Sequence, residues 1–339
     1  METDIASSYW TLFKTEYRSD GCNQQILDKG DREDDRIWEE DFWTESELQK
    51  AFDRLSNKKN GDDNVTSVRD AKVHVVQRFE REAALNWDKF YTRNSTNFFK
   101  DRHYLEEVFP ELLMLADKRK KCLVPSSPYL LLEIGCGVGN ALLPLLERNR
   151  GNANFHAWGF DLSSVAIELM KKDKRFVKAE LDGQARAAIW DVTANPCPLL
   201  LNMKENPYVG ADAALLLFCL SAVSPQKMEI AAKHIIETLK QGGTLLFRDY
   251  GRYDEAEMKL DTAKGKRLGE HFYAKQDGTR CYYFDLDDVK KLFCCDTNGE
   301  STSKKMEIVE LKYIRRIYKN RGDNSVRRRV WVHGRFRKL

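Results

Sequence analysis

Short apolar runs alternate with segments of helical periodicity between residues 129 and 250. The run from Tyr129 to Ile134 leads into a glycine-rich turn, and residues 141–147 then place apolar side chains at helical spacing. Pro144 lies in the first turn of that helical segment, where a missing N–H is tolerated. The pattern therefore predicts a buried strand, a glycine turn and a helix in direct succession.

The same alternation continues along the chain. It predicts further strands at 154–160, 185–190, 211–220 and 244–248, and helices at 165–172, 226–240 and 286–293. Residues 308–318 and 326–336 alternate in polarity on either side of a polar turn, which predicts a β-hairpin. Strands joined by helices are typical of a doubly wound α/β sheet, which binds ligands beyond the carboxyl ends of its strands.

Helices and polar connections are expected ahead of the first strand. A capping box at Thr44–Glu47 predicts a short helix through about residue 55, and residues 68–89 and 104–119 predict two more helices. We therefore divide the chain into three parts. These are a poorly structured acidic extension (1–67), a helical segment (68–124) and an α/β domain (125–339).

Charge is distributed unevenly over the 339 residues. The first 67 residues contain 9 Lys and Arg against 17 Asp and Glu, whereas residues 68–339 contain 47 against 36. Residues 300–339 alone contain 13 against 4, which makes the predicted hairpin strongly basic. A basic body suits a ligand with a phosphate backbone, although a solvated basic surface would have the same composition.

Composition argues against membrane and secreted classes. There is no run of about 18 apolar residues and therefore no expected membrane span. Glu2 and Asp4 open the chain without an apolar core behind them, so no secretory signal is expected. The eight cysteines are scattered without a C-x-x-C pair. This usage favours reduced thiols in the cytoplasm or the nucleus and no metal site.

The glycine turn after the first predicted strand carries the first chemical signal. Its three glycines are Gly135, Gly137 and Gly139, and Asp161 ends the next strand. Glycine lets the backbone approach a ligand closely, and an acid at the second strand end can accept both ribose hydroxyls. Asn140 stands where the dinucleotide pattern G-x-G-x-x-G requires glycine. The observed E-x-G-x-G-x-G, beginning at Glu133, instead resembles motif I of S-adenosylmethionine-dependent methyltransferases.

Residues 87–105 are dense in aromatic and basic side chains. The candidates for contact with RNA are Phe98, Phe99, Lys100, Arg102 and His103. Aromatic faces stack on bases, and guanidinium groups hold phosphates. The same segment would also suit an aromatic cap over a cofactor cleft, and His103 would equally suit an ordinary hydrogen-bonding role.

Several blocks between Phe79 and Phe293 carry a closer resemblance. They include N-W-D-K-F-Y-T-R-N-S-T-N-F-F-K-D-R-H, L-E-I-G-C-G-V-G-N, F-D-L-S-S-V-A-I-E, L-L-F-R-D-Y-G-R-Y-D and H-F-Y-A-K-Q-D-G-T-R-C-Y-Y-F. With these blocks the chain resembles the tRNA 3-methylcytidine methyltransferases of the methyltransferase-like family. The first seventy residues show no match, and Gln226 stands where the family more often has Asp.

This resemblance implies a class I sheet of seven strands in the order 3-2-1-4-5-7-6, preceded by a helical extension. It implies S-adenosylmethionine as cofactor, with contacts from Gly135, Gly137, Asp161, Asp191 and Leu217. It also implies that Trp87 and Tyr91, four residues apart on one helix face, fold over the cofactor.

The implied reaction methylates N3 of a cytidine in the tRNA anticodon loop. N3 carries an in-plane lone pair and is neutral at pH 7, so positioning and electrostatics suffice without a general base. Arg248 would hold the base carbonyl or a phosphate, Asp249 the amino group or the cationic product, and Tyr250 would stack. Arg280 is a further RNA contact. Arg248 and Asp249 would equally form a structural ion pair at the strand end.

Two other functions remain open from the residues alone. One is a methyltransferase of a small molecule or a protein, against which the aromatic and basic segment counts. The other is a non-catalytic RNA-binding subunit, against which the intact glycines and acids count. The resemblance implies tRNA as the macromolecular ligand. It leaves open a partner such as seryl-tRNA synthetase or another RNA-binding protein.

Overall fold

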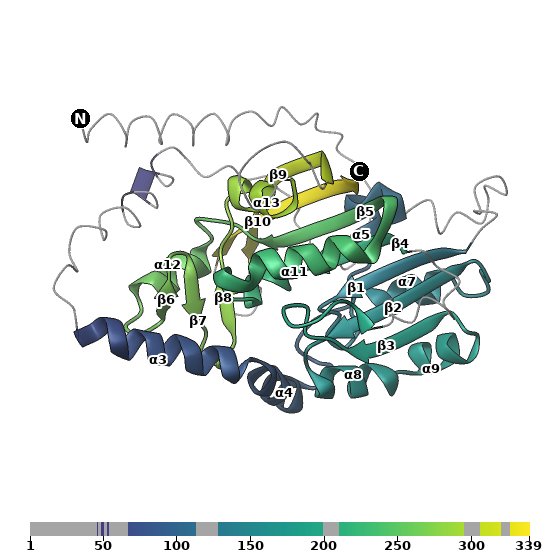
Figure 1. Cartoon of the computed structure of the whole chain (residues 1–339), viewed down its shortest axis with the longest axis horizontal. Helices are drawn as coiled ribbons and strands as arrows, with labels where there is room; N and C mark the ends of the chain where they lie inside the picture. Colours follow the sequence, from purple (N-terminus) through teal and green to yellow (C-terminus); the bar gives the residue numbers. More distant parts are fainter. Residues whose placement is uncertain are drawn as a thin grey trace.

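The computed structural model describes residues 67–112, 128–198, 210–294, 306–319 and 326–339, together with residues 46, 49, 50 and 53. A sheet of seven strands dominates it, in the order β3-β2-β1-β4-β5-β10-β9 (Figure 1). The strands are β1 (Tyr129–Ile134), β2 (Phe155–Asp161), β3 (Ala185–Ile189), β4 (Ala211–Leu217), β5 (Leu239–Tyr250), β9 (Met306–Lys319) and β10 (Val326–Lys338). The first five are parallel, and β10 runs antiparallel to both β5 and β9. This arrangement confirms the predicted doubly wound class I order.

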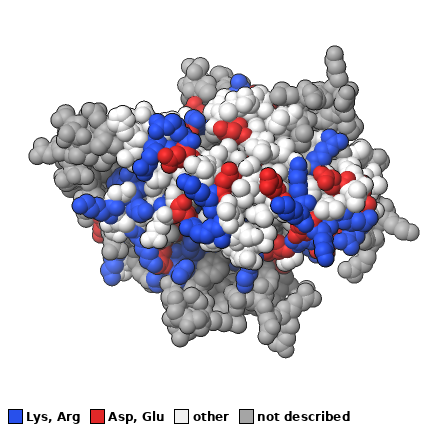
Figure 2. All heavy atoms as spheres, turned by 90° about the horizontal axis from the view of Figure 1, so that it is seen from below, with Lys and Arg blue, Asp and Glu red and all other residues white. Residues whose placement is uncertain are grey.

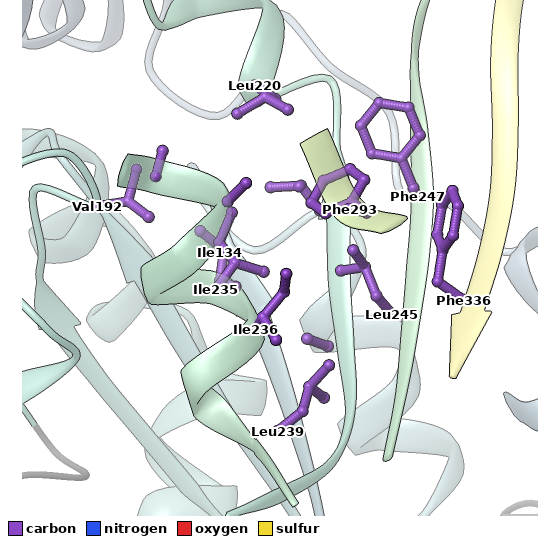
Figure 3. Close-up of a cluster of buried hydrophobic side chains, with 14 of the residues drawn as sticks. Ile134, Val192, Leu220, Ile235, Ile236, Leu239, Leu245, Phe247, Phe293 and Phe336 are labelled. Atoms are coloured by element: carbon purple, nitrogen blue, oxygen red, sulfur yellow. The ribbon is translucent and has the colours of Figure 1, made fainter. Parts of the chain in front are cut away.

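Helices cover both faces of this sheet because successive strand residues point to opposite sides. On one face lie α11 (Pro225–Thr238) and α13 (Leu286–Cys294), which share one core with Leu130, Leu132 and Ile134 of β1. On the other face lie α5 (Leu105–Val108), α7 (Leu142–Arg148), α8 (Ser164–Lys171) and α9 (Lys174–Leu181). The close-up in Figure 3 shows α11 and α13 side chains meeting those of the strands in the first of these cores.

A smaller antiparallel sheet stands at one end of the large one. It consists of β6 (Arg267–Gly269), β7 (Phe272–Ala274) and β8 (Arg280–Tyr282), with α12 (Glu255–Thr262) beside it. The helix α3 (Ser67–Arg81) runs along this small sheet and leads into α4 (Ala83–Asn94) (Figure 1). Buried Asp254, the N-cap of α12, joins that helix to β10, because it accepts from Arg329 Nε at 2.8 Å and Val330 N at 3.0 Å. The sequence did not predict this second sheet.

Two predicted helices differ from the observed ones. The helix expected at 68–89 is interrupted at Glu82, which separates α3 from α4. The helix expected at 104–119 ends its first segment at Phe109, whose φ of −127° and ψ of 92° are extended. Pro110 explains this break, because the residue before proline avoids helical geometry. Residues 113–119, and most of the acidic extension and its predicted helix, lie outside the described residues.

Strand ends also differ from expectation. β5 begins at Leu239 rather than 244 and includes Gly242, whose φ is +77°. β4 ends at Leu217 rather than 220, since Phe218 turns to a φ of +55°. This left-handed backbone is costly for a bulky residue and ends the strand at the edge where ligands bind. Within the described ranges, no helix combines the length and the apolar character needed to cross a membrane.

Candidate active site

A cavity of about 250 Å³ lies at the carboxyl ends of the parallel strands, and α4 forms one of its walls. Every residue that the sequence predicts for cofactor contact lines it: Trp87, Tyr91, Gly135, Gly137, Asp161, Asp191 and Leu217. The fold therefore gathers into one place residues that are up to 130 positions apart in the chain.

The glycine turn is shaped by both backbone geometry and close packing. Gly135 and Gly137 have φ values of +73° and +53°, which disfavour any side chain. A β-carbon at Gly137 would collide with the Tyr91 hydroxyl, and one at Gly135 would collide with the Cys219 side chain. The turn is held on β2, where Gly135 N and Cys136 N both donate to Phe160 O. At Gly135 and Gly137 the turn therefore lines the cavity with backbone atoms alone.

Asp161 connects this turn to the helix that follows β2. Its carboxylate accepts from Gly137 N at 2.7 Å and from Ser163 N at 2.9 Å. Burial raises the pKa of Asp161 to about 6, although these backbone donors oppose the shift. The carboxylate is therefore rigidly placed at the cavity, where it can accept hydroxyl groups from a ribose.

Glu133 is a second acid at the cavity, and the sequence assigned it no contact beyond its place in the glycine motif. Its side chain is 3% exposed, and its Oε2 atom has no hydrogen-bond partner among the described residues. Burial raises the pKa of Glu133 to about 8, with Arg102 opposing and Asp161 adding to the shift. An unpartnered carboxylate oxygen beside Asp161 fits a ligand that carries positive charge and hydrogen-bond donors.

The helix α4 closes the cavity from above the glycine turn, and we call residues 83–94 the lid. Trp87 and Tyr91 stack with their ring centroids 6.0 Å apart, and both line the cavity. Asp88, between them, accepts from Ser163 Oγ at 2.6 Å and from Val165 N at 3.2 Å. The lid thus supplies a carboxylate to the N-terminus of α8, next to Asp161.

The far half of the cavity is built from aromatic and cationic side chains. Tyr250 lines it, with its ring 5.1 Å from that of Phe218 and with Lys275 Nζ 5.3 Å from its centroid. Arg102 covers the Phe218 ring, its Cζ atom 4.9 Å from the centroid. Burial lowers the pKa of Lys275, but Tyr250, Cys281 and Asp277 raise it overall to about 12, so the ammonium stays charged. Such a pocket suits a planar ring that carries hydrogen-bond acceptors.

Of the three predicted catalytic residues, only Tyr250 lines the cavity. Arg248 is fully buried among Tyr104, Phe109 and Trp331 and contacts His333 Nδ1 at 3.1 Å. This position does not match the expected contact with a base or a phosphate, because the surrounding aromatic rings enclose the guanidinium away from the cavity.

Asp249 is buried directly behind the cavity wall. Its carboxylate accepts from Ser221 N and Tyr250 N, both at 2.9 Å. Burial raises the pKa of Asp249 to about 6, against the lowering effect of those donors. In this arrangement Asp249 fixes the backbone of Tyr250 and of the segment after β4 rather than facing a ligand.

The predicted RNA contacts fall into two groups. Phe99, Arg102 and Arg280 line the cavity, whereas Phe98, Lys100 and His103 are exposed outside it. The segment around Phe99 is fixed by Asn140, whose side-chain amide donates to Phe99 O at 3.1 Å and whose backbone carbonyl accepts from Arg102 N at 2.7 Å. The side-chain contact gives asparagine a role at the position where the dinucleotide pattern has glycine.

Comparisons with known proteins agree with this architecture. Residues 79–294 match a family model described as a methyltransferase domain. Among solved structures, a SAM-dependent methyltransferase from Anabaena variabilis superposes with a TM-score of 0.50 at 14% identity, covering 76% of this chain and 95% of that one. At this identity the likeness supports the fold alone.

Curated relatives are more specific. The tRNA N(3)-cytidine methyltransferase METTL6 of Homo sapiens is 38% identical over 262 residues, which cover 77% of this chain and 82% of the relative. The tRNA N(3)-methylcytidine methyltransferase Mettl2 of Drosophila melanogaster is 31% identical over 335 residues, covering 98% and 93%. Together with the cavity and its glycine turn, these matches show that the chain belongs to the tRNA N(3)-cytidine methyltransferase family.

Proposed function

We propose that this protein uses S-adenosylmethionine to methylate N3 of a cytidine in tRNA. The observation that carries the proposal is that two chemically distinct groups of side chains line one cavity, and we call these groups its two halves. One half has the glycine turn, Asp161 and Glu133, which suit a charged nucleoside. The other has Phe218, Tyr250 and Lys275, which suit a base removed from its stack. The activities named for the curated relatives support the same assignment.

The cofactor half offers groups for each part of S-adenosylmethionine. Asp161 would accept the ribose hydroxyls, and Asp191 would accept the adenine amino group. Glu133, with its unpartnered oxygen, would face the positively charged methionine part. When bound, the cofactor supplies an electrophilic methyl group on sulfur. Trp87 and Tyr91 of the lid would exclude water from that group.

The substrate half would position the cytosine ring. Tyr250 and Phe218 present aromatic surfaces at the cavity, and the Lys275 ammonium can donate to a carbonyl oxygen. N3 needs no deprotonation. These residues therefore have only to align its lone pair with the methyl group on sulfur and to surround the cationic product. Asp249 acts as a positioning residue in this scheme, since it holds the Tyr250 backbone.

Two further predictions concern the position of the target cytidine in the tRNA and the need for a protein partner. An anticodon-loop cytidine is unpaired, so its N3 can enter the cavity at little cost. We therefore place the target there. A requirement for seryl-tRNA synthetase or another RNA-binding protein stays a prediction.

Methylation of transcribed tRNA with labelled S-adenosylmethionine, read by nucleoside mass spectrometry, tests the proposal. The wild type should form 3-methylcytidine. Tyr250→Ala should lose about 10- to 100-fold in rate, because stacking on one aromatic ring contributes about 1–3 kcal/mol. Cofactor affinity, measured by calorimetry, should be unchanged in that variant.

Matched controls separate the outcomes. Asp182→Asn, at the exposed end of α9, should leave the rate unchanged. Methylation of a different acceptor would favour the small-molecule or protein alternative. If the wild type bound no cofactor and formed no product, even after addition of cell extract, the proposed function would be wrong.

A further inference from the structure

Glu80, at the end of α3, bridges two cations at the rim of the cavity. Its Oε1 atom lies 2.6 Å from Lys227 Nζ, and its Oε2 atom is paired with Arg280 Nη1. These three residues line the same cavity but come from α3, α11 and β8. The bridge therefore joins three elements that are otherwise held by different parts of the fold.

The two cations differ in exposure, and together they can bind an anion. The Arg280 side chain is 7% exposed and packs over the Phe272 ring, whereas the Lys227 side chain is 43% exposed. Lys227 lies in the first turn of α11, whose dipole also favours negative charge. An arginine fork beside a lysine is the side-chain set that proteins use for phosphate groups.

The occupant, Glu80, is a carboxylate that an incoming anion could replace. Its side chain is 26% exposed, so water and ligands can reach it. Burial raises its pKa, but hydrogen bonds from Lys227 and Arg280 lower it overall, so the group is charged at neutral pH. The exposed Lys227–Glu80 pair contributes little net stability, on the order of 1 kcal/mol or less.

Further cations lie near this rim. Arg81 and Lys275 also line the cavity, and Lys275 belongs to the turn that joins β7 to β8. Figure 2 shows the face that carries α3, α4 and α8, with several groups of Lys and Arg and with Asp and Glu among them. Exposed basic residues of these helices are Arg81, Lys89, Arg93 and Lys171. An RNA backbone reaching the cavity across this face would meet Arg280 and Lys227 at its inner end.

We propose that Arg280 and Lys227 form a binding site for a phosphodiester of the substrate RNA, and that Glu80 occupies this site until the RNA displaces it. The inference rests on the proposed function for the identity of the ligand. Glu80 then holds α3 in place in the free protein and keeps free anions out of the cavity rim. It also makes RNA binding a competition with an internal carboxylate.

The test compares Glu80→Gln with the wild type in binding a short anticodon-arm RNA, by fluorescence anisotropy at several salt concentrations. The amide keeps the shape of the side chain but removes the competing charge. We expect RNA affinity to rise about 3- to 10-fold at low salt. The plot of log affinity against log salt should steepen by roughly 0.7–0.9, because the freed cations now release counterions to one phosphate.

Three further variants make the result specific. Glu237→Gln removes the same charge from an exposed pair with Lys233 on α11 and should change RNA affinity by less than about 1.5-fold. Adding Arg280→Gln or Lys227→Met to Glu80→Gln should abolish the gain. Inorganic phosphate serves as a second probe. It should protect Glu80→Gln, but not the wild type, against thermal unfolding.

The outcomes are separable. RNA affinity of Glu80→Gln equal to or below that of Glu237→Gln overturns the inference, and a gain for phosphate without a gain for RNA overturns the assigned ligand. A gain in RNA affinity without any 3-methylcytidine from the wild type would leave this site standing and reject the proposed reaction. Product formation without the affinity gain would do the reverse.

Discussion

Asp161 shows how one side chain can serve both the fold and the ligand. Its carboxylate accepts backbone N–H groups from the glycine turn and from Ser163, so its position is fixed before any ligand arrives. The cost of that position is desolvation, which raises its pKa to about 6. The ionised form is the one that accepts two ribose hydroxyls, and it becomes the minor form below about pH 6.

Cofactor affinity should therefore depend on pH through Asp161. The carboxyl protonates as the pH falls through about 6, so the contribution of Asp161 to the dissociation constant should be flat above pH 7 and should raise that constant about tenfold per pH unit below 6. The raised pKa has the opposite effect on folding. Its contribution to stability is complete below about 3.8 and is lost as the pH rises through 6. Calorimetry between pH 5 and 9 measures the binding profile.

Asp161→Asn is the variant that assigns this profile. It should weaken cofactor binding about 10- to 100-fold, since a hydrogen bond to a charged group contributes about 1.5–3 kcal/mol. The dependence between pH 5 and 7 should disappear, while any change near pH 8 from Glu133 should remain. A wild-type profile that stays flat down to pH 5 would contradict the role given to Asp161.

The sequence predicts which residues lie at the cavity wherever a motif determines the position of the backbone. Gly137, Asp161 and Tyr250 lie at the cavity because they end strands or turn at a sheet edge. The sequence did not predict the position of Arg248, because its burial depends on Tyr104, Phe109 and Trp331, which come from distant parts of the chain. Glu133 was not predicted as a ligand contact. An acid near the carboxyl end of a buried strand is nevertheless unusual, and it indicates a functional site.

Among the helices, α4 and α8 are joined by a side chain of α4 that accepts hydrogen bonds at the N-terminus of α8. Asp88 of the lid accepts from Val165 N and Ser163 Oγ, so it caps α8 from a different helix. Asp285 caps α13 within its own chain segment, where its Oδ1 atom accepts from Asp288 N at 2.7 Å. The two caps share one chemistry, but only the first connects the lid to the cofactor side of the cavity.

Asp88→Ala should therefore cost both stability and cofactor affinity. Loss of the cap should reduce the free energy of unfolding by about 0.5–2 kcal/mol. The lid, released at one end, should also bind the cofactor severalfold more weakly. Asp285→Ala is the matched control. It should cost similar stability, seen by urea unfolding, with no change in cofactor affinity. Equal affinity losses in both variants would show that the lid contact does not matter for binding.

Elements with strong periodicity were predicted well, and short ones were not. The central strands β1, β2 and β4 are largely apolar, which a sequence reveals directly. The strands β6 to β8 have three residues each, too few for any period. Pro110 did carry a readable signal for the break at Phe109, which the apolar pattern around it outweighed in the prediction.

For the molecule as a whole, the C-terminal hairpin places its second strand, β10, inside the sheet and its first strand, β9, at the edge. β10 pairs with β5 on one side and β9 on the other. Val332 and Phe336 of β10 are fully buried. The basic hairpin that the sequence suggested as an RNA contact therefore has a structural role along this strand, whatever else its exposed residues bind.

Deletion of residues 326–339 should abolish cooperative folding. It would remove the hydrogen-bond partners of two strands and open the core beside Phe293, whose ring centroid lies 5.3 Å from that of Phe336. Thermal unfolding by circular dichroism should show no sigmoidal transition. Removal of Leu339 alone is the control. Its side chain is 55% exposed beyond β10, so Tm should stay within about 2 °C. A cooperative transition in the long deletion would mean that the sheet closes without β10.

The interior position of β10 also has a consequence during synthesis. β5 ends at Tyr250, and its partner begins only at Val326. At about 5–20 residues per second, a ribosome needs roughly 4 to 15 seconds to make the intervening chain. For that time the nascent protein carries a 12-residue strand whose outer N–H and C=O groups have no β10 to pair with, and such edges associate readily. Slow translation of residues 251–325 should therefore lower the soluble yield more than equal slowing ahead of β5.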